Sequence, residues 1–369
     1  MELRKFGNTG RMHSPLGFGM MRLKKNADDT IDQEWVNKTL RSAIDAGLNY
    51  VDTAYIYAGS EVATGIALSG GYREKVTLAS KLPVFKVTCD EDFDNLLNEE
   101  LERLQTDHID CYLLHALSRD RWADVQRLNL LKKMEQAKAD GRIRHIGFSF
   151  HDSLDVFKSI IDAYDGWDFC QIQLNYLDVN YQAGLEGLEY AASKGLAVVI
   201  MEPLRGGRLA DIPADVAAML PSSPVESALD FLWDRPEISV VLSGMSTTEQ
   251  VEQNLEYMNR AKIGMFSEEQ KQAIIAAGDK MRSYISIPCT ACDYCSVCPQ
   301  EIPISQIFKI LNQNQLDGNG ANAKAAYAAL GDNVAANCVN CKQCMDQCPQ
   351  HIEIPLELEK AVKRFGGPM

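Results

Sequence analysis

Between Leu16 and Gly244, eight short runs of apolar and β-branched residues alternate with longer stretches of helical periodicity. Strands that alternate with helices form a parallel sheet, because each crossover helix returns the chain to the same end of the sheet. Eight such strands predict an α/β fold, a (β/α)8 TIM barrel. The expected strands are Leu16–Met21, Leu48–Asp52, Val76–Lys81, Ile109–His115, Ile143–Ser149, Phe169–Leu174, Ala197–Glu202 and Val240–Gly244.

Helices are expected between these strands, several of them capped by glycine at Gly47, Gly141 and Gly195. An open, doubly wound sheet is the alternative, but no Gly-x-Gly-x-x-Gly follows the first strand. The clearest helical stretches are Asp32–Ala46, Asp92–Leu104, Arg127–Ala139, Leu154–Tyr164, Gly184–Lys194, Glu249–Asn259 and Glu268–Arg282.

The composition changes after these helices, at Ile287-Pro288-Cys289, which places a domain boundary near residue 283. We expect a barrel over residues 1–283 and a smaller, mostly helical domain over residues 284–369. Within the tail, Asn312–Gly331 is rich in Asn, Gly and Ala and is expected to form a loop followed by a short helix.

Charge and hydropathy exclude several classes of partner. The net charge of −14 disfavours binding to nucleic acid, which requires clustered Lys and Arg. No stretch reaches the roughly 18 apolar residues of a membrane span. The N-terminus lacks the apolar segment of a secretory signal, so a cytoplasmic location is expected.

Eight of the eleven cysteines fall in two short runs near the C-terminus, which favours metal binding over disulfides. The echo of Cys298-Pro299-Gln300-Glu301-Ile302 in Cys348-Pro349-Gln350-His351-Ile352 indicates an internal repeat. The first run contains Cys289, Cys292, Cys295 and Cys298, and the second contains Cys338, Cys341, Cys344 and Cys348.

The second run has the spacing C-x2-C-x2-C-x3-C-P and resembles a bacterial two-cluster ferredoxin; the first run is one residue shorter. The resemblance implies a ferredoxin-like domain over residues 284–369 that holds two 4Fe-4S clusters. Each cluster would be bound by three closely spaced cysteines of one run and by the cysteine before proline of the other run. Structural zinc is the alternative. Cys89, Cys111 and Cys170 are expected to be buried beside barrel strands. The implied ligand sets are Cys289, Cys292, Cys295 and Cys348, and Cys338, Cys341, Cys344 and Cys298.

Four residues at or after expected strand ends resemble the catalytic tetrad of the aldo-keto reductase family. The match lies in Asp52-Thr53-Ala54-Tyr55-Ile56-Tyr57, at Lys81 and in Leu113-Leu114-His115. Active sites of (β/α)8 barrels lie at the carboxyl ends of the strands, so these positions also fit the expected fold. The resemblance implies that Asp52, Tyr57, Lys81 and His115 are catalytic.

Their chemistry is consistent with reduction of a carbonyl. The developing alkoxide needs a proton, which Tyr57 can supply if a nearby cation favours its ionised form. Lys81 can be that cation, and Asp52 can fix its position. His115 can hydrogen-bond the substrate oxygen or relay the proton.

Further matches imply a nicotinamide cofactor, NADP(H) or NAD(H). Phe150 and Met201 depart from the residues common in the family at two cofactor positions. Thr247 and Thr248 stand where a basic residue usually binds the 2′-phosphate of NADPH, so NADH is an alternative cofactor. By position in the family, the cofactor would contact Met20, Met21, Ser149, Gln173, Leu204, Arg205, Gly207, Gly244, Ser246, Gln250 and Asn254.

The combination resembles a subgroup of the family that carries a C-terminal iron–sulfur domain. It implies an oxidoreductase that transfers hydride between NAD(P)H and a carbonyl or alcohol, with clusters that serve one-electron exchange with a partner protein or brace the structure. Two alternatives stay open at this point. The barrel could bind nucleotide in an electron-transfer or redox-sensing protein with little turnover, or the tail could be a zinc module without a redox role.

Overall fold

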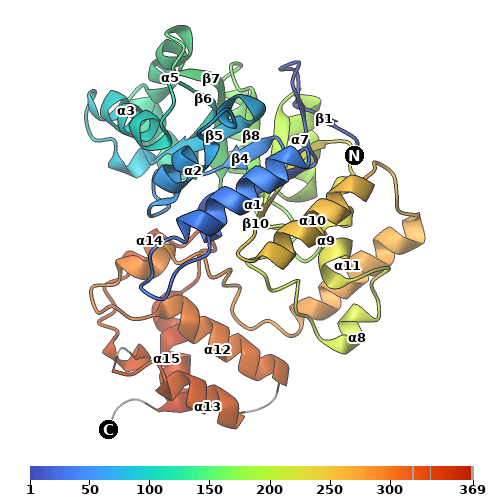
Figure 1. Cartoon of the computed structure of the whole chain (residues 1–369). Coiled ribbons are helices and arrows are strands. Elements are labelled where there is room, and N and C mark those ends of the chain that lie inside the picture. Colours follow the sequence, from blue (N-terminus) through green and yellow to red (C-terminus); the bar gives the residue numbers. More distant parts are fainter. Residues whose placement is uncertain (318–319, 333, 367–369) are drawn as a thin grey trace. The chain divides into compact units, whose positions relative to one another are not determined.

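The computed structural model describes residues 1–317, 320–332 and 334–366 (Figure 1). The chain forms two compact units. The first comprises Met1–Pro203 and Glu226–Ser267, and the second comprises Leu204–Val225 and Glu268–Met369. The predicted domain boundary near residue 283 stays a prediction.

The first unit is a closed barrel of parallel strands, which confirms the predicted (β/α)8 fold. The barrel closes where β10 pairs with β3, with Val241 opposite Leu16 and Gly244 opposite Gly19. The order around the barrel is β10-β3-β4-β5-β6-β7-β8-β9. The strands are β3 (Leu16–Gly19), β4 (Tyr50–Asp52), β5 (Thr77–Leu82), β6 (Ile109–Leu117), β7 (Ile143–Phe150), β8 (Phe169–Gln173), β9 (Ala197–Met201) and β10 (Ile238–Gly244).

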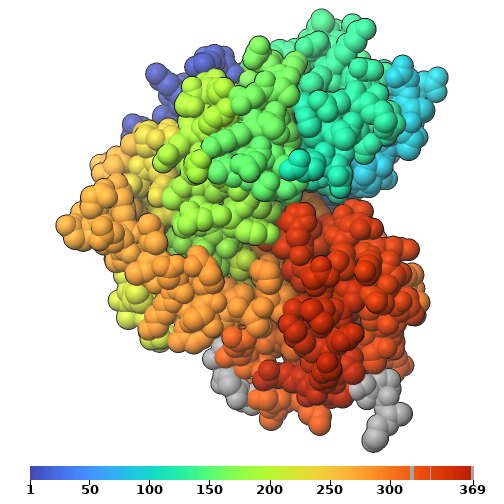
Figure 2. Space-filling view, turned by 180° about the vertical axis from the view of Figure 1, so that it is seen from behind, coloured from blue at the N-terminus to red at the C-terminus, as the bar shows by residue number. Residues whose placement is uncertain are grey.

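Amphipathic helices surround the strands and bury one apolar face each. In α1, for example, the Asp32 side chain accepts a hydrogen bond from the Trp35 amide at the helix start, and Val36 and Leu40 are buried. Seen from the other side, the green segments that include α6 and α7 form a continuous outer surface (Figure 2). The helices are α1 (Gln33–Asp45), α2 (Ser60–Leu68), α3 (Asp92–Leu104), α4 (Arg119–Arg127), α5 (Leu130–Ala139), α6 (Leu154–Asp162), α7 (Gly184–Ser193), α9 (Pro224–Trp233) and α10 (Thr248–Arg260).

The predicted helix Arg127–Ala139 is wrong at its start. Arg127 ends α4, and α5 begins only at Leu130. Asn129 lies between them in the left-handed region, with a φ of 51°, which interrupts the helical hydrogen bonds.

A short antiparallel hairpin of β1 (Arg4–Lys5) and β2 (Met12–His13) precedes the barrel strands. Phe6, between these strands, is fully buried in a cluster of interior side chains that includes Tyr50 and Phe169. Gly7 lets the backbones approach, because a Cβ at this position would lie 2.4 Å from the Ala197 nitrogen. These contacts fill the barrel interior, so the barrel is a packed core rather than a channel.

The three cysteines outside the C-terminal runs differ in environment. Cys111 on β6 and Cys170 on β8 are buried, as predicted. Cys89 is exposed, and the prediction that it is buried is therefore wrong. It lies in the turn before α3, where its amide donates to the carboxylate of Asp92, so it belongs to a polar helix start rather than to a strand.

The second unit is helical around a small apolar core. Ile307, Phe308, Tyr327 and Leu358 are among the buried residues of this core. The Leu204–Val225 segment is held to it by Asp215, whose carboxylate lies 2.6 Å from Lys280 Nζ. Its helices are α8 (Ala214–Ala217), α11 (Glu268–Arg282), η4 (Tyr294–Val297), α12 (Ile304–Asp317), α13 (Gly320–Ala328), η5 (Ala335–Asn337), α14 (Gln343–Asp346) and α15 (Ile354–Phe365).

The loop predicted to begin at Asn312 is wrong, because α12 continues to Asp317. The Asn312 side chain is fully buried, accepts hydrogen bonds from the amides of Ser286 and Ile287 and donates one to the Ile287 carbonyl. This tertiary contact compensates for the low helix propensity of Asn.

Candidate active site

The four predicted catalytic residues meet at the carboxyl end of three adjacent strands. Asp52 is the last residue of β4, Lys81 lies near the end of β5, and His115 lies near the end of β6. Pairing of β4 with β5 and of β5 with β6 brings these ends together. Tyr57 lies in the turn between β4 and α2, and Gly59, with a φ of 72°, turns the chain into the helix.

Lys81 is the centre of the group. Its Nζ lies 2.7 Å from Oδ2 of Asp52 and 2.6 Å from the carbonyl oxygen of Thr53, and it lies 5.2 Å from the centre of the Tyr57 ring. Its side chain is only 1% exposed. Burial raises the pKa of Asp52, whereas the Lys81 ammonium opposes this rise. A buried ammonium held by a carboxylate thus faces the phenol.

His115 completes the group beside Tyr57. The rings of Tyr57 and His115 are edge to face, with their centres 6.1 Å apart. Burial lowers the pKa of His115 well below its usual value, and the positive charges of Lys81 and Arg121 lower it further. The imidazole is therefore neutral at neutral pH and can exchange hydrogen bonds without carrying a charge.

The chain around His115 departs from regular strand geometry. Ala116 has a φ of 54°, and the pairing of β6 with β7 shifts between Leu114 and Leu117. The Ser149 hydroxyl accepts a 2.7 Å hydrogen bond from the Ala116 amide, and Arg121 Nη1 donates to the Ala116 carbonyl at 2.8 Å. Sequence reasoning missed Arg121, because no spacing pattern connects it with the strand ends.

Ser149 and Gln173, expected to hold the nicotinamide carboxamide, end up on the adjacent strands β7 and β8, where both are buried. Gln173 Nε2 donates to the Tyr181 carbonyl at 3.1 Å, but its buried Oε1 has no partner in the described part of the chain. An unpaired buried acceptor is costly and suits a ligand with an N–H donor. Met201 at the end of β9 is partly buried, with its sulfur 3.7 Å from Gln171 Nε2. Phe150 points to the outer helices and packs against Phe157.

The residues expected at the adenosine end gather where β3 and β10 pair. Ser246, which follows β10, is linked to the segment after β3, because its hydroxyl donates to the Arg22 carbonyl at 2.7 Å. Its amide donates to Gln250 Oε1 in α10 at 2.8 Å. Sequence reasoning missed Arg22, which follows Met20 and Met21. Arg22 lies beside Gly244, because a Cβ added to that glycine would lie 3.6 Å from the Cβ of Arg22. The last of the expected residues, Asn254, is buried in α10 and donates to the Ser243 hydroxyl at 3.0 Å.

Leu204, Arg205 and Gly207 belong to the second unit. The Leu204 carbonyl accepts from the amides of Gly207 and Leu209 and closes a tight turn. Arg205 has a φ of 47° and is only 4% exposed. The turn therefore combines strained backbone with a buried cation.

The eight C-terminal cysteines lie in the second unit in two groups. The Cys295 thiol lies within electrostatic range of Cys292, Cys289 and Cys348. The Cys344 thiol is in range of the other four-cysteine set, Cys298, Cys338 and Cys341. Among the residues that the structure describes, no group of three or more His, Cys, Asp or Glu side chains is arranged to hold a metal ion.

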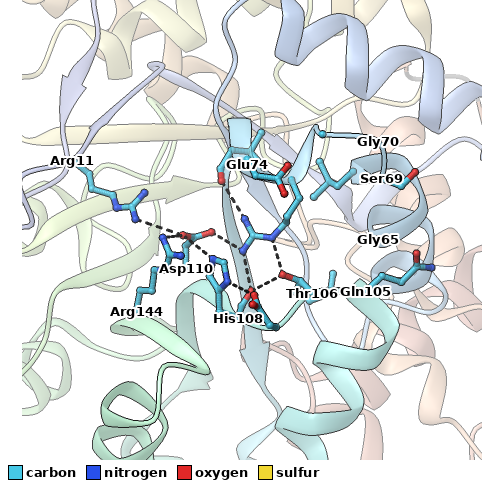
Figure 3. Close-up of a pocket in the computed structure, with 16 residues that line it drawn as sticks. Arg11, Gly65, Ser69, Gly70, Glu74, Gln105, Thr106, His108, Asp110 and Arg144 are labelled. Atoms are coloured by element: carbon cyan, nitrogen blue, oxygen red, sulfur yellow. Dashed lines mark hydrogen bonds and ion pairs between the residues drawn. The ribbon is translucent and has the colours of Figure 1, made fainter.

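A separate pocket of about 510 Å³ lies at the opposite, amino-terminal end of the strands (Figure 3). Its centre is the buried carboxylate of Asp110, which lies 2.9 Å from Arg73 Nη2, 3.4 Å from Arg144 Nη1 and 3.6 Å from Arg11 Nη2. Asp110 also accepts from the Leu78 amide. These contacts tie the starts of β5, β6 and β7 to the N-terminal hairpin, so the pocket reflects barrel stability and is distinct from the tetrad.

Comparison with known proteins places the barrel. A family model described as "Aldo/keto reductase family" matches residues 15–276. L-Galactose dehydrogenase of Arabidopsis thaliana is 28% identical over 283 residues, 69% of this chain and 87% of that protein. Methylglyoxal reductase DkgB of Escherichia coli O157:H7 is 26% identical over 70% of this chain and 91% of its own length. No helix in the described ranges is long and apolar enough to cross a membrane.

Among solved structures, an aldo-keto reductase of Bacillus halodurans in its holo form is similar in fold. It has a TM-score of 0.64 and 24% identity, over 75% of this chain and 96% of its own. The family match ends at residue 276, before the first of the C-terminal cysteines.

Proposed function

Because this chain belongs to the aldo/keto reductase family and is therefore an NAD(P)H-dependent oxidoreductase, we propose that Tyr57 is its general acid and base in hydride exchange with a carbonyl or alcohol. The observation that carries this proposal is the position of Lys81. Its ammonium is bound to Asp52 at 2.7 Å and lies 5.2 Å from the Tyr57 ring.

Each member of the tetrad has a separate task. The Lys81 charge favours the ionised form of Tyr57, so the phenol can both donate a proton to a developing alkoxide and take it back. Asp52 holds the ammonium in place. The neutral imidazole of His115 orients the substrate oxygen by a hydrogen bond.

A bound nicotinamide nucleotide would supply or accept the hydride. The buried, unpaired Oε1 of Gln173 fits the amide N–H of a nicotinamide carboxamide, and the Ser149 hydroxyl can donate to its oxygen. Either NADPH or NADH is compatible with this proposal. The hydroxyl of Thr247 already caps α10 by accepting from the Gln250 amide, and Arg22 lies beside Gly244.

The second unit is proposed to hold two 4Fe-4S clusters that exchange single electrons with a partner protein. The donor set fits, because eight thiolates are the ligands of two such clusters. Cys295 lies in electrostatic range of Cys348, and Cys344 in range of Cys298, which is consistent with the crossover that the ferredoxin resemblance implies.

The substitution Tyr57→Phe tests the acid/base assignment. We expect carbonyl reductase activity to fall about 10²- to 10⁴-fold, the usual contribution of general acid catalysis. Tyr55→Phe is the matched control, because Tyr55 lies in the same turn but bonds Glu99 at 2.7 Å. Full activity of the Tyr57→Phe protein would refute the assignment.

Iron and acid-labile sulfide analysis after anaerobic purification tests the clusters. We expect eight iron atoms per chain and a broad visible absorption that reductant bleaches. Zinc in a colourless protein would refute the cluster proposal and leave the reductase proposal intact.

A further inference from the structure

Positive charge surrounds His115 in the tetrad. The ammonium of Lys81, the guanidinium of Arg121 and the protonated form of His151 all act on the imidazole and disfavour a charge on it. No carboxylate acts on the imidazole with the opposite sign in the described part of the chain. Asp52 pairs with Lys81, so Arg121 is the cation that has no task within the tetrad. Because His115 is proposed to bind the substrate oxygen, the substrate would bind in a field that favours negative charge.

Local packing holds Arg121 beside the end of β6. Arg121 lies in the first turn of α4, which packs against β6 and against the short helix η3 (Val84–Lys86). Its Nη1 donates to the carbonyl oxygen of Ala116 at 2.8 Å, and Ala116 directly follows His115 in the chain. The guanidinium carbon lies 5.7 Å from the centre of the ring of Phe85, an exposed residue of η3. The half-buried guanidinium is therefore fixed at the same end of the barrel as the tetrad.

The acidic residues closest to Arg121 in this region do not act on His115. The carboxylate of Asp152 accepts hydrogen bonds from two backbone amides, at the starts of α4 and α6. Asp124 forms an ion pair at 2.7 Å farther along α4, and Asp120 is exposed. None of these three carboxylates counters the positive charges that act on the imidazole. An anionic group of a substrate would thus meet cations, and no carboxylate, around His115.

We propose that Arg121 binds a carboxylate carried by the substrate, so that the enzyme acts on oxo acids and on the corresponding hydroxy acids. This inference rests on the proposed function, because it requires that the tetrad binds the reacting oxygen. A guanidinium presents paired N–H donors that match the two oxygens of a carboxylate. One guanidinium also balances the single charge of a carboxylate, whereas a phosphate carries nearly two. With its carbonyl at His115 and its carboxylate at Arg121, an oxo acid would be preferred over a neutral carbonyl compound of similar size.

The test compares oxo acids with their methyl esters, which have the same carbonyl but no charge. The whole protein is assayed with NADPH and with NADH on glyoxylate and on succinic semialdehyde, whose carboxylates lie beside the carbonyl and two carbons away. We expect kcat/KM in at least one pair to be about 10- to 100-fold higher for the acid than for its ester, the usual effect of a hydrogen bond to a charged group.

The substitution Arg121→Gln should remove this preference by lowering kcat/KM for the acid alone. Glutamine can still donate to the Ala116 carbonyl, so the backbone contact is kept. Arg119→Gln is the matched control, because Arg119 is exposed in the same helical turn and does not act on His115. It should leave the ratio of acid to ester unchanged.

The esters separate recognition from a merely structural role of Arg121. If Arg121→Gln lowered kcat/KM equally for acid and ester, or if the parent protein preferred the esters, the inference would be wrong and the reductase assignment would stand. Reduction of methylglyoxal without reduction of either acid would have the same meaning. A parent protein that reduced no carbonyl compound would instead overturn the proposed function. Should Arg121→Gln not fold, Arg121→Lys is measured, and it should keep part of the preference for the acid; equal kcat/KM for acid and ester in that variant would count against the inference.

Discussion

The substitution Lys81→Met isolates the charge pair at the centre of the tetrad. The side chain of Asp52 is only 4% exposed and its Oδ2 bonds Lys81 Nζ at 2.7 Å, while its buried Oδ1 has no partner in the described structure. Removing the ammonium leaves a buried carboxylate without a cation. The loss of one partner of a buried ion pair costs about 3 to 5 kcal/mol, and we expect this decrease in the free energy of unfolding at pH 8.

The pH dependence of this loss has a definite sign. Burial raises the pKa of Asp52 in the folded state, and Lys81 opposes the rise, so the pKa rises further in Lys81→Met. The folded variant then binds a proton more tightly than the unfolded chain, which stabilises it as the pH falls through the folded-state pKa. The stability difference from the parent protein is therefore largest above that pKa and narrows at lower pH.

Urea unfolding at pH 8 and pH 5, together with reductase assays, measures these effects. The double variant Asp52→Asn/Lys81→Met removes both charges and should recover much of the stability but none of the activity. Lys86→Met is the control, since Lys86 is exposed and lies over the ring of Tyr55. If Lys81→Met unfolds at the same urea concentration as the parent at pH 8, or if adding Asp52→Asn restores nothing, the electrostatic account of this pair is wrong.

Three further predictions concern other buried polar groups. Because the pKa of His115 lies well below its usual value, the pH profile of kcat/KM for carbonyl reduction should show no ionisation of this histidine between pH 6 and 8. An inflection in that range that disappears in His115→Asn would contradict the neutral state of the imidazole. Burial and the neighbouring Glu61 raise the pKa of Glu100 well above its usual value, so the parent loses stability as the pH rises from the unfolded-state pKa of this carboxyl to its folded-state pKa. Glu100→Gln cannot ionise and should not show this loss, so in urea unfolding its stability relative to the parent should increase between pH 4 and pH 7, and an unchanged difference would contradict the raised pKa. Asn312→Ala removes four hydrogen bonds to residues 286 and 287 and should lower the free energy of unfolding by about 2 to 3 kcal/mol. Thermal unfolding measures this, and an unchanged melting temperature would contradict it.

Most of the barrel could be predicted because the local and global preferences agree. Buried parallel strands read as continuous apolar runs, and Ile109–Leu117 and Ala197–Met201 are examples in which every residue is buried or nearly so. The positive φ angles of Gly47 and Gly195 likewise agree with their predicted caps. The tetrad is implied by the resemblance to the family motif, and the pairing of β4, β5 and β6 brings the strand ends that carry it together.

The error at Asn312 comes from the effect of a distant contact on local preference. No feature of the sequence near Asn312 indicates that its side-chain amide bonds Ile287, so the low helix propensity of Asn favours a loop at this position. The Leu204–Val225 segment follows a barrel strand in sequence but belongs to the second unit. Its link to that unit, between Asp215 and Lys280, joins charges far apart in the chain.

Two buried aspartates at opposite ends of the barrel show how structural and functional charge can be told apart. Asp110 at the amino-terminal end is surrounded by Arg73, Arg144 and Arg11 and accepts a backbone amide, so its charge is compensated several times over. Asp52 at the carboxyl end has one cation and an unpaired oxygen. A charge placed only for stability gains from every added partner, whereas Lys81 must keep its field directed at a phenol. The sparsely compensated pair is therefore the one that we assign to catalysis.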